Sequence, residues 1–300
     1  MADRDGGFSI SRHLGHIAQA IAAYGVFFFS RLLPFAAASN LGGRLGRAVG
    51  PRLAVSELAR RNLERAFPEK TASEIDNIIT GMWDNLGRTA FEYPHLDKLK
   101  IYDGDIVEVT GAERIDALKN DGKPGIFFTG HLANWEISAL TVARRGLPIH
   151  MVYRAPNNPL MEGLFRRHHH RPADGELIAK GPQGARRLLA LLRDGGHLGI
   201  LVDQKMNDGI AAPFFGRDAM TAPALAKFAL KFQCPVVPVQ TVRTHGAHFR
   251  VIHHQPLEIA PTGDTRADVA AIMKRVNAML ESWIREHPEQ WFWVHNRWPD

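Results

Sequence analysis

The sequence contains a histidine and a glutamate whose spacing suits acid–base chemistry: His131 and Glu136, in the segment Gly130-His-Leu-Ala-Asn-Trp-Glu136. Five residues of a regular helix turn through about 500°, so the two side chains would lie roughly 140° apart if both were helical. His131 is therefore predicted to precede a helix, with Gly130 permitting the turn and Asn134 acting as the N-cap. Glu136 would then lie in the first helical turn and reach back to the imidazole.

A carboxylate that fixes the tautomer and orientation of an imidazole makes it a competent general base toward an alcohol. The spacing of His131 and Glu136 is equally compatible with a surface histidine beside a glutamate that caps the helix. The residues alone leave both interpretations open.

The pattern of apolar residues predicts the elements that would position this pair. Short apolar runs alternate with helical segments, which favours a single-domain, layered α/β fold with a mostly parallel central sheet flanked by helices. His131 would lie at the carboxyl end of a strand, where such folds place their sites. The predicted strands cover residues 106–110, 125–129, 149–153, 198–202, 235–240 and 249–252, and the predicted helices cover 55–67, 71–91, 135–145, 159–169, 183–193, 222–232 and 267–285.

The N-terminal region carries a strongly apolar run over residues 17–36, interrupted by Arg31 and Pro34. We expect residues 1–50 to form an apolar, membrane-associated helical segment and residues 51–300 to form the catalytic domain. The run could span the bilayer with a tilt or lie in its interface, and a buried amphipathic helix is the alternative. Arginines within and after the run favour the cytoplasmic side for the bulk of the protein.

The composition restricts the possible partners. The chain has 37 Lys and Arg against 31 Asp and Glu, a net charge of +6, which suits anionic partners such as phospholipid headgroups, phosphorylated glycolipids or an acidic carrier protein. No nucleic-acid-binding signature accompanies the charge, so a nucleic-acid partner is not expected.

Cys234 is the single cysteine, which excludes an intramolecular disulfide. The three consecutive histidines 168–170 lack a neighbouring cysteine or acidic pair and indicate a basic surface rather than a metal site.

Four separated segments resemble the lipid A biosynthesis late acyltransferases, the lauroyl and myristoyl transferase family within the glycerolipid/lysophospholipid acyltransferase superfamily. These segments are GHLANWE at 130–136, RNLERAFPE at 61–69, VYRAPNNPL at 152–160 and HPEQWFWVHNR at 287–297. They occur in the family's order, and the resemblance extends from about residue 30 to the end. It implies an O-acyltransferase of lipopolysaccharide biosynthesis.

The resemblance also implies roles for particular residues. His131 would deprotonate the acceptor hydroxyl and Glu136 would orient His131, while Arg171, Asp203 and Arg154 would bind substrate. No metal and no cofactor are required. The implied donor is an acyl-acyl carrier protein, the acceptor is a lipid A precursor, and the enzyme would act at the cytoplasmic face of the inner membrane. The alternatives are another glycolipid or lysophospholipid acceptor, or a non-catalytic lipid-binding homologue.

Overall fold

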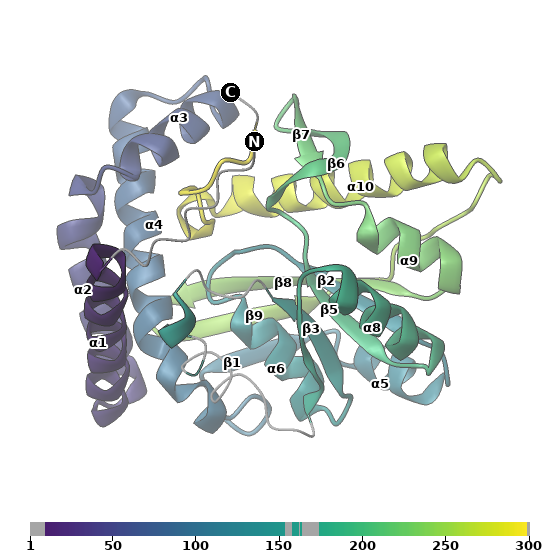
Figure 1. Cartoon of the computed structure of the whole chain (residues 1–300), viewed down its shortest axis with the longest axis horizontal. Coiled ribbons are helices and arrows are strands. Elements are labelled where there is room, and N and C mark those ends of the chain that lie inside the picture. The colour runs from purple at the N-terminus through teal and green to yellow at the C-terminus, as the bar shows by residue number, and fades with distance from the viewer. Residues whose placement is uncertain (1–9, 154–157, 162, 164–173, 299–300) are drawn as a thin grey trace.

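The computed structural model describes residues 10–153, 158–161, 163 and 174–298. Its centre is a seven-stranded sheet (Figure 1), whose strands in chain order are β1 (Val107–Thr110), β2 (Gly125–Thr129), β3 (Ile149–Tyr153), β4 (Leu177–Ala179), β5 (His197–Leu201), β8 (Val236–His245) and β9 (His248–His253). The spatial order is β1-β9-β8-β2-β5-β3-β4. All neighbouring strands are parallel except β8 and β9. The prediction of a mostly parallel α/β sheet is therefore confirmed.

Helices cover both faces of the sheet, because successive residues of each buried strand point to opposite sides. Phe127 of β2 packs on one side with Ile137, whereas Phe128 packs on the other side with Leu225 and Leu280. The first side is covered by α5 (Glu113–Asn120) and α6 (Glu136–Arg144), and the second by α8 (Pro182–Arg193), α9 (Ala224–Phe232) and α10 (Thr265–Glu286). The result is a three-layer arrangement.

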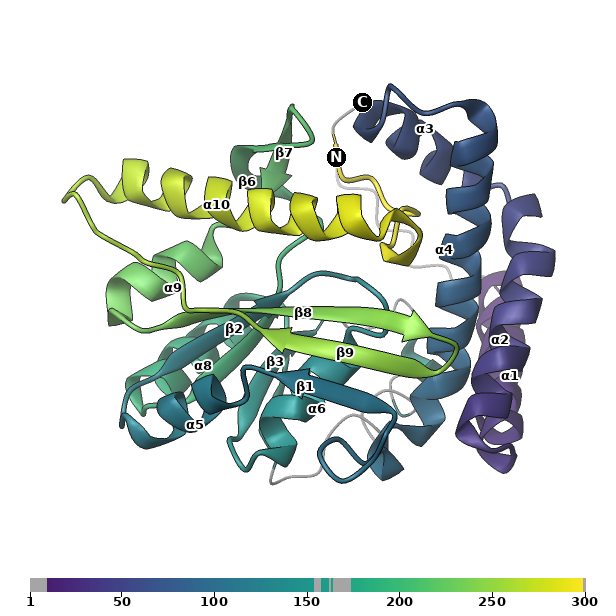
Figure 2. The same ribbon diagram turned by 180° about the vertical axis from the view of Figure 1, so that it is seen from behind.

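A further layer of helices stands against one end of this sandwich, as both ribbon views show (Figures 1 and 2). It contains α1 (Ile10–Leu32), α2 (Phe35–Val49), η1 (Gly50–Arg52), α3 (Ser56–Ala66), α4 (Ala72–Glu92) and η2 (Tyr93–Lys98). The predicted start of α4 is confirmed, since Thr71 and Glu74 form a capping box. Gly42 and Gly87 let α2 and α4 touch through their backbones, because a Cβ on Gly42 would lie 2.2 Å from the Gly87 carbonyl oxygen.

The apolar run over residues 17–36 is divided between two helices. α1 ends at Leu32 and α2 begins at Phe35, so Pro34 lies at the break, where its missing N–H removes no helical hydrogen bond. In the part of the chain that the structure describes, no helix combines the length and the apolar character needed to cross a membrane.

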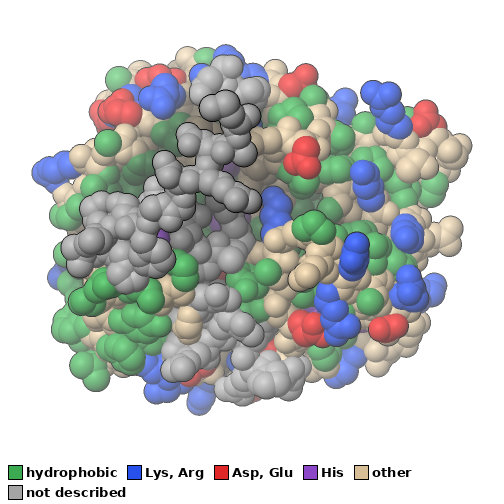
Figure 3. Space-filling model, in the orientation of Figure 1, with side chains coloured by type: hydrophobic (Ala, Val, Ile, Leu, Met, Phe, Trp, Pro, Cys, Tyr) green, Lys and Arg blue, Asp and Glu red, His purple; other side chains and the backbone are tan. Residues whose placement is uncertain are grey.

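Large apolar side chains are nevertheless exposed on this N-terminal layer. On α1, Ile21, Phe28 and Leu32 are 69%, 60% and 83% exposed. Figure 3 shows hydrophobic side chains gathered on the side where α1 and α2 lie, whereas charged side chains are scattered over the opposite side. The exposed large apolar side chains of α1, α2 and the segment that follows are Ile21, Val26, Phe28, Phe29, Leu32, Leu45, Val49, Leu53 and Val55.

Several elements were not predicted. They are α5, β4, the separate hairpin of β6 (Lys205–Phe214) and β7 (Arg217–Thr221), and the 3-10 turns η1, η2 and η5 (Pro288–Gln290). The 3-10 turn η3 (Pro159–Met161) lies at the start of a predicted longer helix. β4 has three residues, and β6 contains Gly209 and a break in register, so neither has a clear two-residue alternation. Of the helix predicted over 159–169, residues 162 and 164–169 lie outside the described residues.

Candidate active site

His131 lies in the turn that links β2 to α6, at the carboxyl edge of the sheet. We call residues 130–135 the catalytic turn. The His131 side chain is 13% exposed, and its Nδ1 lies 2.7 Å from Oδ1 of Asp203. The backbone N–H of His131 donates to Oδ2 of the same carboxylate at 2.7 Å. One aspartate therefore fixes both the backbone and the ring of His131.

Asp203 follows β5, which pairs with β2 in parallel register from Gly125 and His197 to Thr129 and Leu201. The carboxyl ends of the two strands therefore meet, and this brings Asp203 to His131. The Asp203 side chain is 0% exposed, and its Oδ2 also accepts a hydrogen bond from Nε1 of Trp291 at 2.7 Å. Trp291 is itself 1% exposed and belongs to the core.

The histidine and aspartate stabilise each other's charges. Burial disfavours ionisation of Asp203, but the charge and hydrogen bonds of His131 outweigh it and hold the pKa of this carboxyl well below its usual range. Burial likewise disfavours protonation of His131, and the charge and hydrogen bond of Asp203 overcome it, so the pKa of the imidazole is raised. Because an ionised carboxylate only accepts, Nδ1 carries the proton and Nε2 is left as the basic nitrogen.

Glu136 lies in the first turn of α6, as predicted, and is its first residue, but Asn134 is not the N-cap. The cap position is occupied by Trp135 without a side-chain cap hydrogen bond, and Asn134 is fully buried and donates to Glu92 instead. Oε1 of Glu136 accepts from Nε1 of Trp135 at 2.9 Å. The negative charge of Glu136 also contributes to the raised pKa of His131, after burial and Asp203. Glu136 thus acts on the imidazole through its charge, whereas the Nδ1 hydrogen bond goes to Asp203.

The histidine opens onto a cavity of about 930 Å³ that both His131 and Glu136 line. Nε2 of His131 lies 3.4 Å from the side-chain nitrogen of Gln204, another lining residue. The remaining wall is mainly apolar and divides between the two faces of the sheet. The α6 side is formed by Ala139, Leu140, Ala143, Met151 and Leu177, and the α8/α9 side by Val152, Ala185, Leu188, Ile200, Ala224 and Phe228.

The α6 side of this cavity starts at the catalytic turn and follows one face of the helix. Glu136, Ala139, Leu140 and Ala143 have the three- and four-residue spacing of a single helical face. From Glu136 to Ala143 the helix rises about 10 Å. Asp174, which also lines the cavity, accepts two hydrogen bonds from Nη1 of Arg144 at 2.9 and 3.0 Å.

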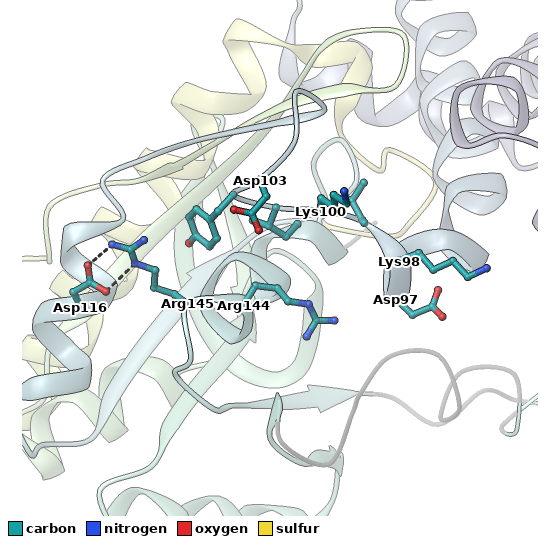
Figure 4. A pocket seen from close by; sticks show the side chains of 10 residues that line it. Asp97, Lys98, Lys100, Asp103, Asp116, Arg144 and Arg145 are labelled. Atoms are coloured by element: carbon teal, nitrogen blue, oxygen red, sulfur yellow. Dashed lines mark hydrogen bonds and ion pairs between the residues drawn. The ribbon is translucent and has the colours of Figure 1, made fainter.

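Arg144 belongs at the same time to the wall of a second, polar cavity of about 770 Å³ (Figure 4). Arg144 and Arg145 leave the end of α6 in different directions, and Arg145 forms a bidentate ion pair with Asp116. The Arg144–Asp174 ion pair therefore joins the walls of the polar and the apolar cavity. An apolar chain that runs along α6 from His131 meets charged groups at this point.

Of the other residues with predicted site roles, the structure describes only Asp203. Arg154 and Arg171 lie outside the described residues. Asp203 was expected to bind substrate, and its fully buried carboxylate is instead engaged by His131 and Trp291. Sequence reasoning missed Trp291 and Gln204 as neighbours of the site. Trp291 lies in the C-terminal segment that resembles the family, and Gln204 directly follows Asp203. Residue type alone does not reveal what either side chain contacts.

The arrangement of His131, Asp203 and the cavity is suited to general-base chemistry on a lipid alcohol. A neutral imidazole with a fixed tautomer at the mouth of an apolar cavity can remove a proton from an alcohol whose lipid portion fills that cavity. This is what an acyltransferase that acts on lipid hydroxyls requires.

Comparison with known proteins identifies the family. The family model for bacterial lipid A biosynthesis acyltransferases matches residues 7–300, so the chain belongs to this family and is an acyltransferase. It is 25% identical over 283 residues to a lipid A biosynthesis acyltransferase of Haemophilus influenzae, covering 90% of this chain and 85% of the relative. It is also 26% identical to the lipid A biosynthesis palmitoleoyltransferase of Escherichia coli (91% and 88% covered) and 25% identical to the myristoyltransferase of that organism (84% and 77%). The resemblance seen in the four sequence segments is confirmed.

Proposed function

We propose that this acyltransferase moves a fatty acyl chain from acyl-acyl carrier protein to a hydroxyl group of a lipid A precursor, with His131 as the general base. The observation that carries the proposal is the buried Asp203 held 2.7 Å from Nδ1 of His131, which leaves Nε2 directed to the substrate side. The printed names of the relatives supply the acceptor class.

The reaction follows from this arrangement. Nε2 of His131 takes the proton of the acceptor hydroxyl as the oxygen attacks the carbonyl carbon of the thioester. A C–O bond forms, the tetrahedral intermediate collapses, and the C–S bond breaks. The proton then passes from the imidazolium to the leaving sulfur, so the enzyme returns to its starting state. Asp203 stays ionised throughout and stabilises the imidazolium.

Glu136 has a supporting electrostatic part in this proposal. Its carboxylate lines the cavity and favours the protonated form of His131, the form that proton transfer from the acceptor produces. Arg154 and Arg171 remain proposed ligands of substrate phosphate or of developing negative charge, for which a planar guanidinium is well suited.

The two-sided cavity supports lipid substrates, because the reaction must bring a fatty acyl chain and a lipid acceptor to one base. We assign the acyl chain to the α6 side, which begins at Glu136 and ends at the Arg144–Asp174 ion pair. An extended chain advances about 1.2 Å per bond, as in an extended polypeptide, so the helix segment of about 10 Å matches roughly eight bonds beyond the carboxyl group.

This assignment predicts that Ala143→Leu shifts the donor preference to shorter chains. The larger side chain fills the end of the α6 side, and each methylene that no longer fits is expected to cost about 10-fold in kcat/KM. A panel of acyl-acyl carrier proteins of increasing chain length measures the shift. Ala185→Leu on the α8 side is the matched control, and a donor shift caused by it rather than by Ala143→Leu would place the acyl chain on the opposite side.

The exposed apolar side chains of α1 support a membrane surface as the third partner. Ile21, Phe28 and Leu32 have a spacing that places them along one side of the helix. We propose that this side inserts into the interface of the inner membrane, with the catalytic domain on the cytoplasmic side. Each buried large apolar side chain would contribute about 1.5–3 kcal/mol.

The membrane proposal predicts that Ile21→Glu, Phe28→Glu and Leu32→Glu together lower the partition onto anionic phospholipid vesicles by at least about 100-fold. Sedimentation of the protein with vesicles measures the partition. The matched control places three glutamates at Ala267, Ala271 and Ala278, which are exposed on α10. If both variants lose vesicle binding equally, the added negative charge explains the loss and the proposed insertion of α1 is contradicted.

The function itself is tested by transfer of a radiolabelled acyl chain from acyl carrier protein to purified lipid A precursor in detergent. Product formation by the wild type supports the proposal. No transfer by folded wild type, together with transfer to a lysophospholipid or another glycolipid offered in parallel, would move the assignment to that acceptor.

A further inference from the structure

The catalytic turn has a strained backbone that other elements hold in place. Ala133 has a φ of 50°, a left-handed conformation that residues with a side chain rarely adopt. Its N–H donates to the carbonyl of Gln290 at 2.9 Å. Its carbonyl accepts from Nδ2 of Asn85 at 3.1 Å and from the hydroxyl of Thr89 at 3.2 Å. Both polar groups of this backbone unit are therefore satisfied by residues outside the turn.

A buried carboxylate holds the next residue. Nδ2 of Asn134 donates to Oε2 of Glu92 at 2.9 Å, and both side chains are 0% exposed. Glu92 also forms a buried ion pair with Arg243 of β8, whose Nη2 lies 3.0 Å from Oε2. The hydroxyl of Ser39 in α2 donates to the other oxygen of Glu92 at 2.6 Å. One carboxylate thus connects α2, α4, β8 and the catalytic turn.

The opposite side of the turn is held by the segment after η5. The N–H of Phe292 donates to the carbonyl of His131 at 3.2 Å, and Leu132 forms a bridge with Trp291. Gln290, whose carbonyl accepts from Ala133, exchanges two hydrogen bonds with the backbone of Arg243. Arg243 is therefore linked to the turn from both sides.

Protein stability alone does not explain the buried Glu92–Arg243 ion pair. Such a pair often stabilises a fold no more than apolar residues of similar volume would, because both charges lose their hydration on burial. Such a network does impose a single geometry on the groups bonded to it. An error of about 1 Å in the position of a reacting group can lower a rate 100-fold.

We propose that Asn134, anchored by the buried Glu92–Arg243 pair, is a positioning residue that holds His131 against Asp203 and toward the substrate cavity. This inference rests on the proposed role of His131 as the general base. The groups that face the imidazole from the surrounding elements are Asp203, which follows β5, Glu136 of α6 and His295 of the C-terminal segment. A shift of the catalytic turn alters the separation of His131 from Asp203, because both the ring and the backbone N–H of His131 are bonded to that carboxylate.

The test is Asn134→Ala in the full-length enzyme. Its kcat is expected to fall about 10- to 100-fold, while KM for donor and acceptor stays within about twofold. The acid limb of the pH–kcat/KM profile should move to lower pH, because a weaker contact with Asp203 no longer raises the pKa of His131 to the same extent. A role in folding alone would reduce the folded fraction and would leave kcat per folded molecule and the pH profile unchanged.

Asn277→Ala is the matched control, since Asn277 is also 0% exposed and its Nδ2 donates to Pro213 and Thr221, away from the turn. Thr89→Val is a second variant that removes a hydrogen bond to Ala133 without changing the side-chain volume. It should show a smaller loss of kcat and the same direction of pH shift. Asn134→Ala and Thr89→Val enzymes with the kcat and pH profile of Asn277→Ala would overturn the positioning role. An inactive wild type would instead count against the proposed function.

Discussion

Replacement of His131 by alanine is expected to lower acyl transfer by about 100-fold or more, since a positioned general base contributes about 10²–10⁴ to such rates. The variant should bind both substrates nearly as well as the wild type, because the imidazole is proposed to act in proton transfer rather than in holding the acyl chains. Single-turnover transfer of a radiolabelled acyl chain from acyl carrier protein to lipid A precursor measures the loss.

His245→Ala is a suitable control for this experiment, because His245 is an exposed histidine at the end of β8. It should retain wild-type transfer. Equal transfer by wild type and His131→Ala enzymes would exclude the general-base mechanism and would favour a lipid-binding role for the scaffold.

Asp203→Asn is expected to produce a loss of similar size, on the order of 10²–10⁴-fold, because the amide no longer stabilises the imidazolium or selects the tautomer with a free Nε2. The variant also makes a prediction about pH. His131 acts as a base only when neutral, so the activity of the wild type falls as the pH decreases through a pKa that lies above the ordinary value of about 6.5. Without the negative charge of Asp203, that pKa should decrease and the acid limb should move to lower pH.

The pH–kcat/KM profile of both enzymes measures this displacement. Asp268→Asn serves as the control, because Asp268 is a buried aspartate of α10 that accepts hydrogen bonds from Thr262. An Asp203→Asn enzyme with the wild-type rate of transfer and an unchanged acid limb of its pH–kcat/KM profile would contradict the assignment of Asp203 as the partner of His131.

The local elements around the site could be predicted from the sequence. The strand predicted at 125–129 and the start of the helix predicted at 71–91 correspond to β2 and to the start of α4, because each signal is contained within a few residues. The placement of His131 before a helix whose first turn contains Glu136 is also a local matter, since their spacing excludes a common helical face. Four motifs in a fixed order indicated the family, and the match over residues 7–300 confirms it.

The prediction for Asn134 was wrong for a reason that lies outside its own segment. Asparagine before a helix is a good N-cap by residue type. Here the amide NH₂ group of Asn134 donates to the buried carboxylate of Glu92 in α4, 42 positions away, and the helix has no side-chain cap. The exposed face of α1 was predictable only in part, since an apolar run does not reveal which of its residues other helices cover.

Residue types and short-range spacing thus determined the α/β elements, the position of His131 at a strand end and the candidate role of Glu136. The tertiary structure decided which carboxylate the imidazole contacts. That partner is Asp203, 72 positions further along the chain, and it reaches His131 because β5 lies beside β2 in parallel and both strands end at the same edge. No local pattern contains this pairing, because the order of strands in a parallel sheet is set by how the helices between them pack, not by the strands' own sequences.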